Sequence, residues 1–190
     1  MGAIKGHLFI ISGPSGAGKS TIVDAVLKKR PQLRYSVSYT TRAPRRDEKD
    51  GVDYHFVSES AFFKMIDAGE LAEWAEVHGH LYGTSAQFIE EARVGGQDVL
   101  LDIDVQGARR LLEKYPEAIS VFVQTPSIAE LEKRLIKRGL DSPEAVKRRL
   151  KNAKAELAHT HLYDHVLVND DLGRTVSQLE AIIHEAYRDG

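Results

Sequence analysis

Apolar and polar positions alternate along the chain with two different periods, which predicts a mixed α/β protein. Short, continuously apolar runs such as Leu8–Ile11 and Val99–Leu101 are typical of strands that a parallel sheet buries on both faces. Stretches with apolar residues at helical spacing, such as 21–30, lie between these runs. Because strands and helices alternate, we expect a parallel sheet with helices on both faces.

Serines, glycines and prolines mark the ends of these elements. Ser58 and Ser142 are suited to cap helices, Pro143 fits a first helical turn, and Gly69 ends a helix. The segment from 38 to about 84 is richer in strands and interrupts the α/β alternation. We expect strands over residues 8–12, 33–38, 52–57, 71–77, 99–104, 119–124 and 165–168. We expect helices over residues 21–30, 59–68, 85–94, 105–114, 127–137, 142–159 and 173–187.

A glycine-rich segment follows the first strand and leads into the first helix. It reads Gly-Pro-Ser-Gly-Ala-Gly-Lys-Ser, the pattern Gly-x-x-x-x-Gly-Lys-[Ser/Thr], in which backbone N–H groups approach phosphate oxygens. Lys19 is placed to reach the β- and γ-phosphates, the Ser20 hydroxyl to reach Mg²⁺, and the helix dipole adds positive potential. The sequence therefore predicts a nucleoside triphosphate site rather than a simple turn. We assign to it Gly13, Pro14, Ser15, Gly16, Ala17, Gly18, Lys19, Ser20 and Thr21.

Composition narrows the class of protein. The 190 residues suffice for one core with small appended lobes, and 42% hydrophobic and 28% charged residues are ordinary for a globular protein. A net charge of −2 gives no global attraction to nucleic acid or to an anionic membrane. The absence of cysteine excludes disulfides and thiolate metal sites. We expect a cytoplasmic location, with no cleavable leader and no membrane span.

Two carboxylates follow the apolar run that begins at Val99. Unpaired buried carboxylates are costly, and in open α/β sheets the carboxyl ends of strands line the ligand crevice. We therefore expect Asp102 to hold Mg²⁺ through water and Asp104 to face whatever binds opposite. Both could instead cap the next helix, which suits Asp104 better than Asp102. Asp104-x-x-Gly107 also matches a short GTPase motif, but no Asn-Lys-x-Asp guanine motif follows.

A charged loop carries a second candidate anion site. The segment Ser-Val-Ser-Tyr-Thr-Thr-Arg-Ala-Pro-Arg places Arg42 and Arg45 three residues apart. Two guanidinium groups can bind one phosphate through paired hydrogen bonds. The charged neighbours at 46–50 fit a solvated loop equally well, so spacing alone leaves both interpretations open.

Together with these segments, further motifs make the chain resemble the guanylate kinase family over nearly its whole length. The matching segments are 13–20, 36–45, 51–57, 73–77, 82–84, 101–107, 134–139 and 168–171. The resemblance implies a P-loop NTPase-type parallel sheet with a small β-rich lobe for a nucleoside monophosphate and a helical lid. The implied core comprises 1–36, 90–125 and 160–190, the implied GMP lobe 37–89, and the implied lid 126–159.

The resemblance also implies roles for single residues in transferring the γ-phosphate of ATP to GMP with Mg²⁺. The acceptor phosphate falls to Arg42, Arg45, Tyr54 and Tyr82, and the rest of the GMP site to Ser38, Glu73, Gly83, Thr84 and Asp104. A carboxylate such as Glu73 can accept both N1–H and the 2-amine of guanine, which adenine cannot offer, and the hydroxyls of Ser38 and Thr84 can donate to O6. On the ATP side the candidates are Arg134 and Arg138, with Asn169 at the adenine end. Lys19, Arg42, Arg138 and Arg149 are the implied catalytic residues, although Arg148 could replace Arg149.

Two other functions remain to be weighed. Guanylate-kinase-like domains also serve as protein-interaction modules, typically with a degraded phosphate loop, whereas here that loop and the arginines are intact. A related ribose-phosphate kinase would not need Ser38, Glu73 and Thr84 together. We therefore expect an enzyme whose partners are ATP and GMP, with no nucleic acid or membrane partner, and the sequence leaves its oligomeric state open.

Overall fold

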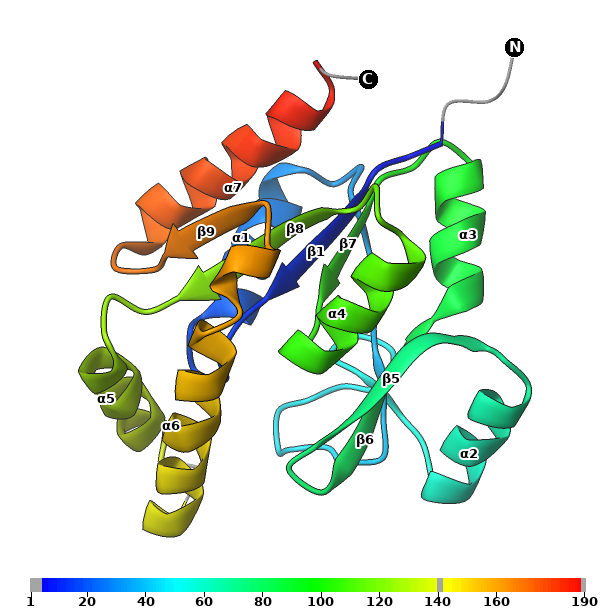
Figure 1. Cartoon of the computed structure of the whole chain (residues 1–190). Helices are drawn as coiled ribbons and strands as arrows, with labels where there is room; N and C mark the ends of the chain where they lie inside the picture. The colour runs from blue at the N-terminus through cyan, green and yellow to red at the C-terminus, as the bar shows by residue number, and fades with distance from the viewer. Residues whose placement is uncertain (1–4, 140–141, 189–190) are drawn as a thin grey trace. The chain divides into compact units, whose positions relative to one another are not determined.

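The computed structural model describes residues 5–139 and 142–188 (Figure 1). The chain divides into two compact units. The first, unit 1, comprises 1–8, 32–101 and 106–118, and the second, unit 2, comprises 9–31, 102–105 and 119–190.

The larger of the two sheets is parallel and has five strands. Its strand order is β2 (Arg34–Tyr35), β7 (Val99–Asp102), β1 (Leu8–Ser12), β8 (Ile119–Gln124) and β9 (His165–Val168). The apolar runs of β1 and β8 are buried almost completely, as expected for strands covered on both faces. The order and direction confirm the predicted α/β architecture with a parallel sheet.

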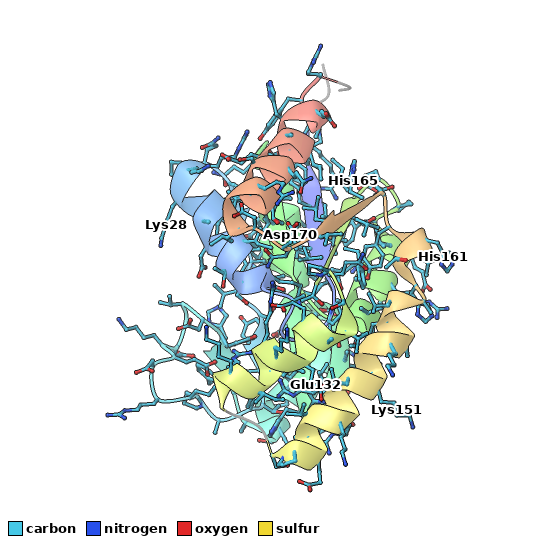
Figure 2. All side chains as sticks on the ribbon, turned by 90° about the vertical axis from the view of Figure 1, so that its left-hand side faces the viewer. Lys28, Glu132, Lys151, His161, His165 and Asp170 are labelled. Atoms are coloured by element: carbon cyan, nitrogen blue, oxygen red, sulfur yellow. The ribbon has the colours of Figure 1, made fainter. Side chains whose placement is uncertain are left out.

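Unit 2 carries the glycine-rich segment and most of the C-terminal helices. They are α1 (Lys19–Lys29), α5 (Ile128–Arg138), α6 (Pro143–Leu157), η1 (Thr160–Leu162) and α7 (Leu172–Ala186). Helices α5 and α6 share a small apolar core made of Leu131, Leu135, Val146 and Ala153. Charged side chains such as Lys28, Glu132 and Lys151 are exposed (Figure 2).

Unit 1 contains a second, smaller sheet with the order β4 (His55–Phe56), β3 (Tyr39–Thr40), β6 (His80–Ser85) and β5 (Leu71–Val77). Its helices are α2 (Glu59–Asp67), α3 (Ala86–Val94) and α4 (Val105–Lys114). Strands β5 and β6 form an antiparallel hairpin whose two turn residues, His78 and Gly79, have φ of 55° and 85°. Positive φ at both positions is the geometry that matches the twist of a tight hairpin.

A β-bulge lies at the start of that hairpin. Leu71 pairs with Ser85 while Glu73 pairs with Thr84, so Ala72 is the additional residue on β5. From Val77 opposite His80 to Glu73 opposite Thr84 the register set by the turn is unbroken. The bulge shifts only the pairing beyond Glu73, so that Leu71 faces Ser85.

Three of the expected strands are shorter in the structure, and one of them is 99–104, of which only Val99–Asp102 is a strand. Only His55–Phe56 of the expected 52–57 strand is extended, because 49–54 folds into a turn in which Asp53 accepts from the backbone N–H of Lys49. Only Arg34–Tyr35 of the expected 33–38 strand joins the large sheet. The expected serine caps are present, with Ser58 accepting from Ala61 N–H and Ser142 from Ala145 N–H. None of the described helices is long and apolar enough to span a membrane.

Candidate active site

The glycine-rich segment of unit 2 forms a tight loop between β1 and α1. Gly13, Gly16 and Gly18 have φ of 136°, 93° and 95°, a region that favours glycine. The Lys19 ammonium donates to the carbonyl of Gly13 at 2.7 Å and lies 3.4 Å from that of Pro14. The lysine therefore lies back over its own loop, with its charge where phosphate groups are expected.

Two side chains from outside the loop support it. The Asn169 amide, at the end of β9, donates to the carbonyl of Ala17 at 2.8 Å, and Arg134 of α5 donates to the carbonyl of Asn169 at 2.8 Å. A Cβ at Gly18 would lie 2.3 Å from the Asn169 amide nitrogen. The sequence predicts Asn169 at the adenine end, and this contact with the loop carbonyl is one that the sequence did not suggest.

Ser20 and Asp102 form the candidate metal site. The Ser20 hydroxyl donates to the Asp102 carboxylate at 3.0 Å. Burial raises the pKa of Asp102, and the charge of Lys19 and the Ser20 hydrogen bond offset part of that rise. A hydroxyl and a carboxylate are hard oxygen donors that suit Mg²⁺, which usually takes its remaining ligands from substrate phosphates and water. No larger group of His, Asp or Glu side chains able to hold a metal occurs among the described residues.

Arginines of the two helices after β8 differ in their placement. Arg149 of α6 donates to the Ser15 hydroxyl of the loop at 3.0 Å, whereas its neighbour Arg148 is exposed. Arg138 of α5 is exposed as well. Of the adjacent pair that the sequence left open, Arg149 is the residue that contacts the loop in this structure.

One carboxylate near the loop was missed at the sequence level. Glu156 lies on α6, and its pKa is raised by burial, with the charge of Lys19 opposing and that of Asp104 reinforcing the rise. Glu156 follows Arg149 and the buried Ala153 at helical spacing along α6. This spacing is the signal by which the sequence could have revealed Glu156.

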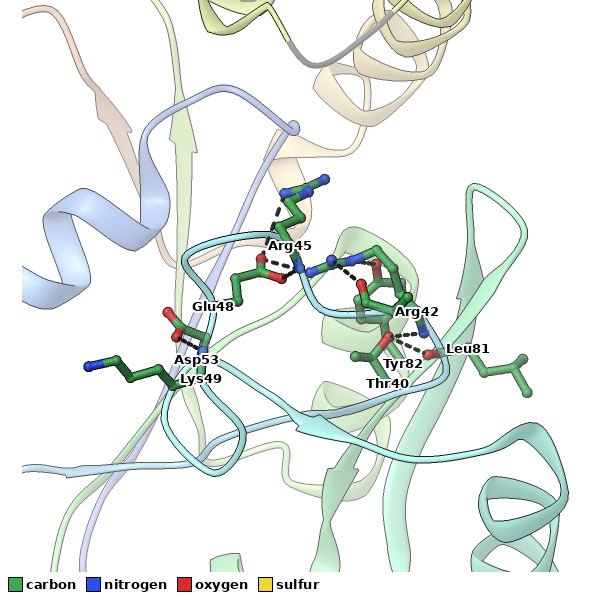
Figure 3. A network of polar contacts seen from close by, with 9 residues as sticks. Thr40, Arg42, Arg45, Glu48, Lys49, Asp53, Leu81 and Tyr82 are labelled. Carbon is green, nitrogen blue, oxygen red and sulfur yellow. Dashed lines mark hydrogen bonds and ion pairs between the residues drawn. The ribbon is translucent and has the colours of Figure 1, made fainter.

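The candidate acceptor site lies in unit 1 and centres on Arg42 (Figure 3). Its Nε donates to the Tyr82 hydroxyl at 3.2 Å, and its guanidinium carbon lies 5.3 Å from the centre of the Tyr54 ring. Its Nη2 donates to Glu48 at 2.8 Å. Burial alone would lower the pKa of Arg42, but the bonds to Glu48 and Tyr82 outweigh it and the pKa is raised.

Glu48 completes this cluster. Its second carboxylate oxygen accepts from the backbone N–H of Arg45 at 2.8 Å. Burial alone would raise the pKa of Glu48, but the bonds from Arg42 and Arg45 reverse the direction and lower it. Arg42 and Glu48 are therefore both charged near neutral pH.

A second group of predicted GMP residues lies on the β5–β6 hairpin. Glu73 and Thr84 are buried, and the Thr84 hydroxyl donates to the Glu73 carboxylate at 2.6 Å. The sequence predicts that this hydroxyl donates to a base, whereas here its hydrogen is directed to Glu73. Ser38 is buried as well. At Gly83 there is no room for a side chain, because a Cβ there would lie 2.8 Å from the Leu71 side chain. The hairpin thus fixes one buried carboxylate through a neighbouring hydroxyl.

The predicted residues therefore gather in two constellations. Unit 2 holds the phosphate loop with Asp102, Asp104, Arg134, Arg149 and Asn169. Unit 1 holds Ser38, Arg42, Arg45, Tyr54, Glu73, Tyr82, Gly83 and Thr84. Asp104, predicted to assist at the base, belongs to the unit that carries the loop.

Comparisons with known proteins agree in naming one family. Residues 5–186 match the family model described as guanylate kinase. The chain is 49% identical over 179 residues to the guanylate kinase of Geobacter sulfurreducens, covering 94% of this chain and 88% of that relative. It is 51% identical over 179 residues to the guanylate kinase of Symbiobacterium thermophilum, covering 94% and 85%.

A solved structure gives the same result. The crystal structure of guanylate kinase from Anaplasma phagocytophilum superposes with a TM-score of 0.81 at 34% identity, and the match covers 97% of this chain and 87% of that one.

Proposed function

Because the chain belongs to the guanylate kinase family, we propose that it transfers the γ-phosphate of ATP to GMP and releases ADP and GDP. The observation that carries this proposal is that the chain has an intact phosphate loop with Lys19 in place and a separate arginine–tyrosine cluster. A donor and an acceptor phosphate each need such a site.

On the donor side, we assign the loop and Lys19 to the β- and γ-phosphates of ATP. Ser20 and Asp102 hold Mg²⁺ in this proposal, Asp102 through water. When bound, Mg²⁺ neutralises phosphate charge and so eases the transfer. Asn169 supports the loop by donating to the carbonyl of Ala17, and Arg134 donates to the carbonyl of Asn169.

On the acceptor side, we assign Arg42, Arg45, Tyr54 and Tyr82 to the GMP phosphate. Ser38, Glu73, Gly83, Thr84 and Asp104 complete the GMP site. Glu73 accepts from N1–H and the 2-amine of guanine. A nucleotide that lacks these donors would leave the buried carboxylate of Glu73 without those two hydrogen bonds, which is a strong basis for discrimination between bases.

The chemistry needs positioning and charge stabilisation more than proton transfer. A phosphate oxygen of GMP is already ionised at neutral pH, so no general base is required. Lys19, Arg138 and Arg149 stabilise negative charge that spreads over the transferred group, while Arg42 aligns the acceptor. We assign 126–159 to a lid that excludes water, 37–89 to the GMP lobe, and 1–36, 90–125 and 160–190 to the core. We place the reaction in the cytoplasm, in keeping with the cysteine-free sequence.

A coupled assay of ADP formation tests the proposal directly. With ATP and Mg²⁺ present, GMP, AMP, CMP, UMP and a ribose bisphosphate are compared as acceptors. We expect GMP to exceed each of the others by roughly 10³-fold or more in kcat/KM. Absence of turnover would favour an interaction module, and preference for the ribose bisphosphate would assign the chain to a different kinase.

A further inference from the structure

The carboxylate of Glu48 joins the two predicted phosphate-binding arginines in unit 1 (Figure 3). One oxygen accepts from Arg42 Nη2 at 2.8 Å and lies 3.9 Å from Arg45 Nη1. The other accepts from the backbone N–H of Arg45 at 2.8 Å. The backbone N–H of Glu48 donates in turn to the carbonyl of Arg45 at 3.1 Å, which closes a turn.

The geometry around Arg42 shows what this carboxylate controls. Arg42 also donates through Nε to Tyr82 and through Nη1 to the carbonyl of Ala43, at 3.2 and 2.8 Å. With the bond to Glu48, each of its three nitrogens has one partner. Two of the five guanidinium N–H groups then remain without a partner among the residues that the structure describes.

We propose that Glu48 is a positioning residue for GMP: it fixes Arg42 against the Arg45 backbone so that the remaining N–H groups of Arg42 are directed at the acceptor phosphate. The inference rests on the proposed function, since it needs GMP as the acceptor. Charge supports it, because a carboxylate beside two guanidinium groups offsets their mutual repulsion before the phosphate binds. Burial supports it as well, because the side chains of Arg42 and Glu48 are only 13% and 17% exposed.

Glutamine cannot replace this carboxylate. Both Glu48 oxygens face donors, namely Arg42 Nη2 and the backbone N–H of Arg45. Glutamine keeps the size of the side chain but has one acceptor oxygen, so its NH₂ group would face a donor. Aspartate keeps the charge but is one methylene shorter, so it cannot span both donors from the same backbone.

The test is steady-state kinetics of the full chain with the Glu48→Gln variant. We expect KM for GMP to rise by about tenfold or more, and KM for ATP to stay within about twofold, because only the acceptor contact is disturbed. Glu48→Asp should give a smaller rise. The matched control is Asp47→Asn, since Asp47 is exposed and makes no hydrogen bond or ion pair with any described residue. Asp47→Asn removes one negative charge, as Glu48→Gln does, but one position earlier in the chain.

Hydrogen exchange gives a readout that is independent of turnover. The backbone amide of Arg45 donates to Glu48, so it should exchange faster in Glu48→Gln than in Asp47→Asn. Melting temperatures that agree within a few degrees show that both variants are folded.

Each result has one meaning. An unchanged KM for GMP, or unchanged exchange at Arg45, overturns the positioning role. A lower KM for GMP also overturns it and makes Glu48 a competitor of the acceptor phosphate. If the wild type forms no GDP from GMP, the proposed function fails, and the Arg45 exchange still decides whether Glu48 fixes the loop.

Discussion

At the scale of single residues, Lys19 is the side chain on which the proposed donor site most depends. It donates to the carbonyls of its own loop at 2.7 and 3.4 Å, so its charge is held at the loop before any ligand arrives. Lys19→Ala should lower turnover by at least about 10²–10³-fold, because a preorganised cation at the developing charge is lost. GMP binding, measured by calorimetry without ATP, should change by less than about twofold.

Lys28→Ala is the control for that measurement, since Lys28 is an exposed lysine on the same helix. Turnover of Lys19→Ala close to that of this control would contradict the assignment of the phosphate loop.

The phosphate loop could be recognised in the sequence because its geometry is local. Spacing within eight residues determines which backbone N–H groups converge. The bond from Asn169 to Ala17 joins residues 152 positions apart, and such contacts leave no periodic signal. Glu48 was missed for a different reason: in a run of charged residues nothing in the sequence separates a side chain that bonds two arginine groups from its solvated neighbours.

At the scale of elements, helix ends were the most predictable feature, because capping depends on one side chain and the next three residues. Ser127 accepts from the backbone N–H of Glu130 at 3.1 Å and so begins α5. Ser127→Ala should lower the free energy of unfolding by about 1 kcal/mol and the melting temperature by about 2–4 °C. Ser177→Ala makes the same change inside α7 and should be neutral or stabilising, as urea denaturation of both variants will show.

Short strands were the least predictable elements. The alternation over 52–57 predicted one strand, but Gly51 at φ 73° and the contact of Asp53 with Lys49 turn most of that stretch into a loop. The two residues of β3 carry no pattern of their own and are extended because β6 and β4 pair with them. The strands that pair with such a short segment, and not its local propensity, determine whether it is extended.

A buried tyrosine links α4 to α3 and gives the fold a dependence on alkaline pH. Tyr115 follows α4, and its hydroxyl donates to Glu90 at 2.8 Å. Burial and this bond raise the pKa of Tyr115 to about 12, above the value of about 10 in an unfolded chain. The folded state holds the proton more tightly, so this contribution to stability is complete below about pH 10 and is lost as pH rises through about 12.

Urea denaturation of wild type and Tyr115→Phe checks this dependence. The difference in unfolding free energy between the two proteins should be constant below about pH 10 and shrink above it. A difference that stays constant to about pH 12 would contradict the raised pKa.

At the scale of the whole molecule, the single tryptophan of the chain offers a test of the proposed GMP site in unit 1. Trp74 adjoins Glu73 on β5, and the guanidinium carbon of Arg110 lies 5.5 Å from the centre of its ring. GMP bound beside Glu73 should change the fluorescence of Trp74, and AMP at equal concentration should change it less, because AMP lacks the donors that Glu73 accepts. Equal responses, or none in an active enzyme, would contradict the placement of guanine.

The overall architecture was predictable because periodicity and motifs both indicated the same α/β fold. In the structure Ser20 meets Asp102 and Tyr82 meets Arg42, and the roles assigned to these residues stay predictions. What the sequence could not supply were the partners of each polar atom. Those depend on side-chain directions that only the packed structure determines.

The register of the β5–β6 hairpin makes the order of Ala72 and Glu73 matter more than their identity. Exchanging Ala72 and Glu73 yields an isomer of this protein with identical mass, charge and composition. In that isomer the carboxylate occupies the additional position of the bulge, and alanine takes the place opposite Thr84. Its preference for GMP over AMP in kcat/KM should fall by on the order of 10²-fold. Base selectivity in this chain would then be a property of strand register, which the two-residue turn of the hairpin sets.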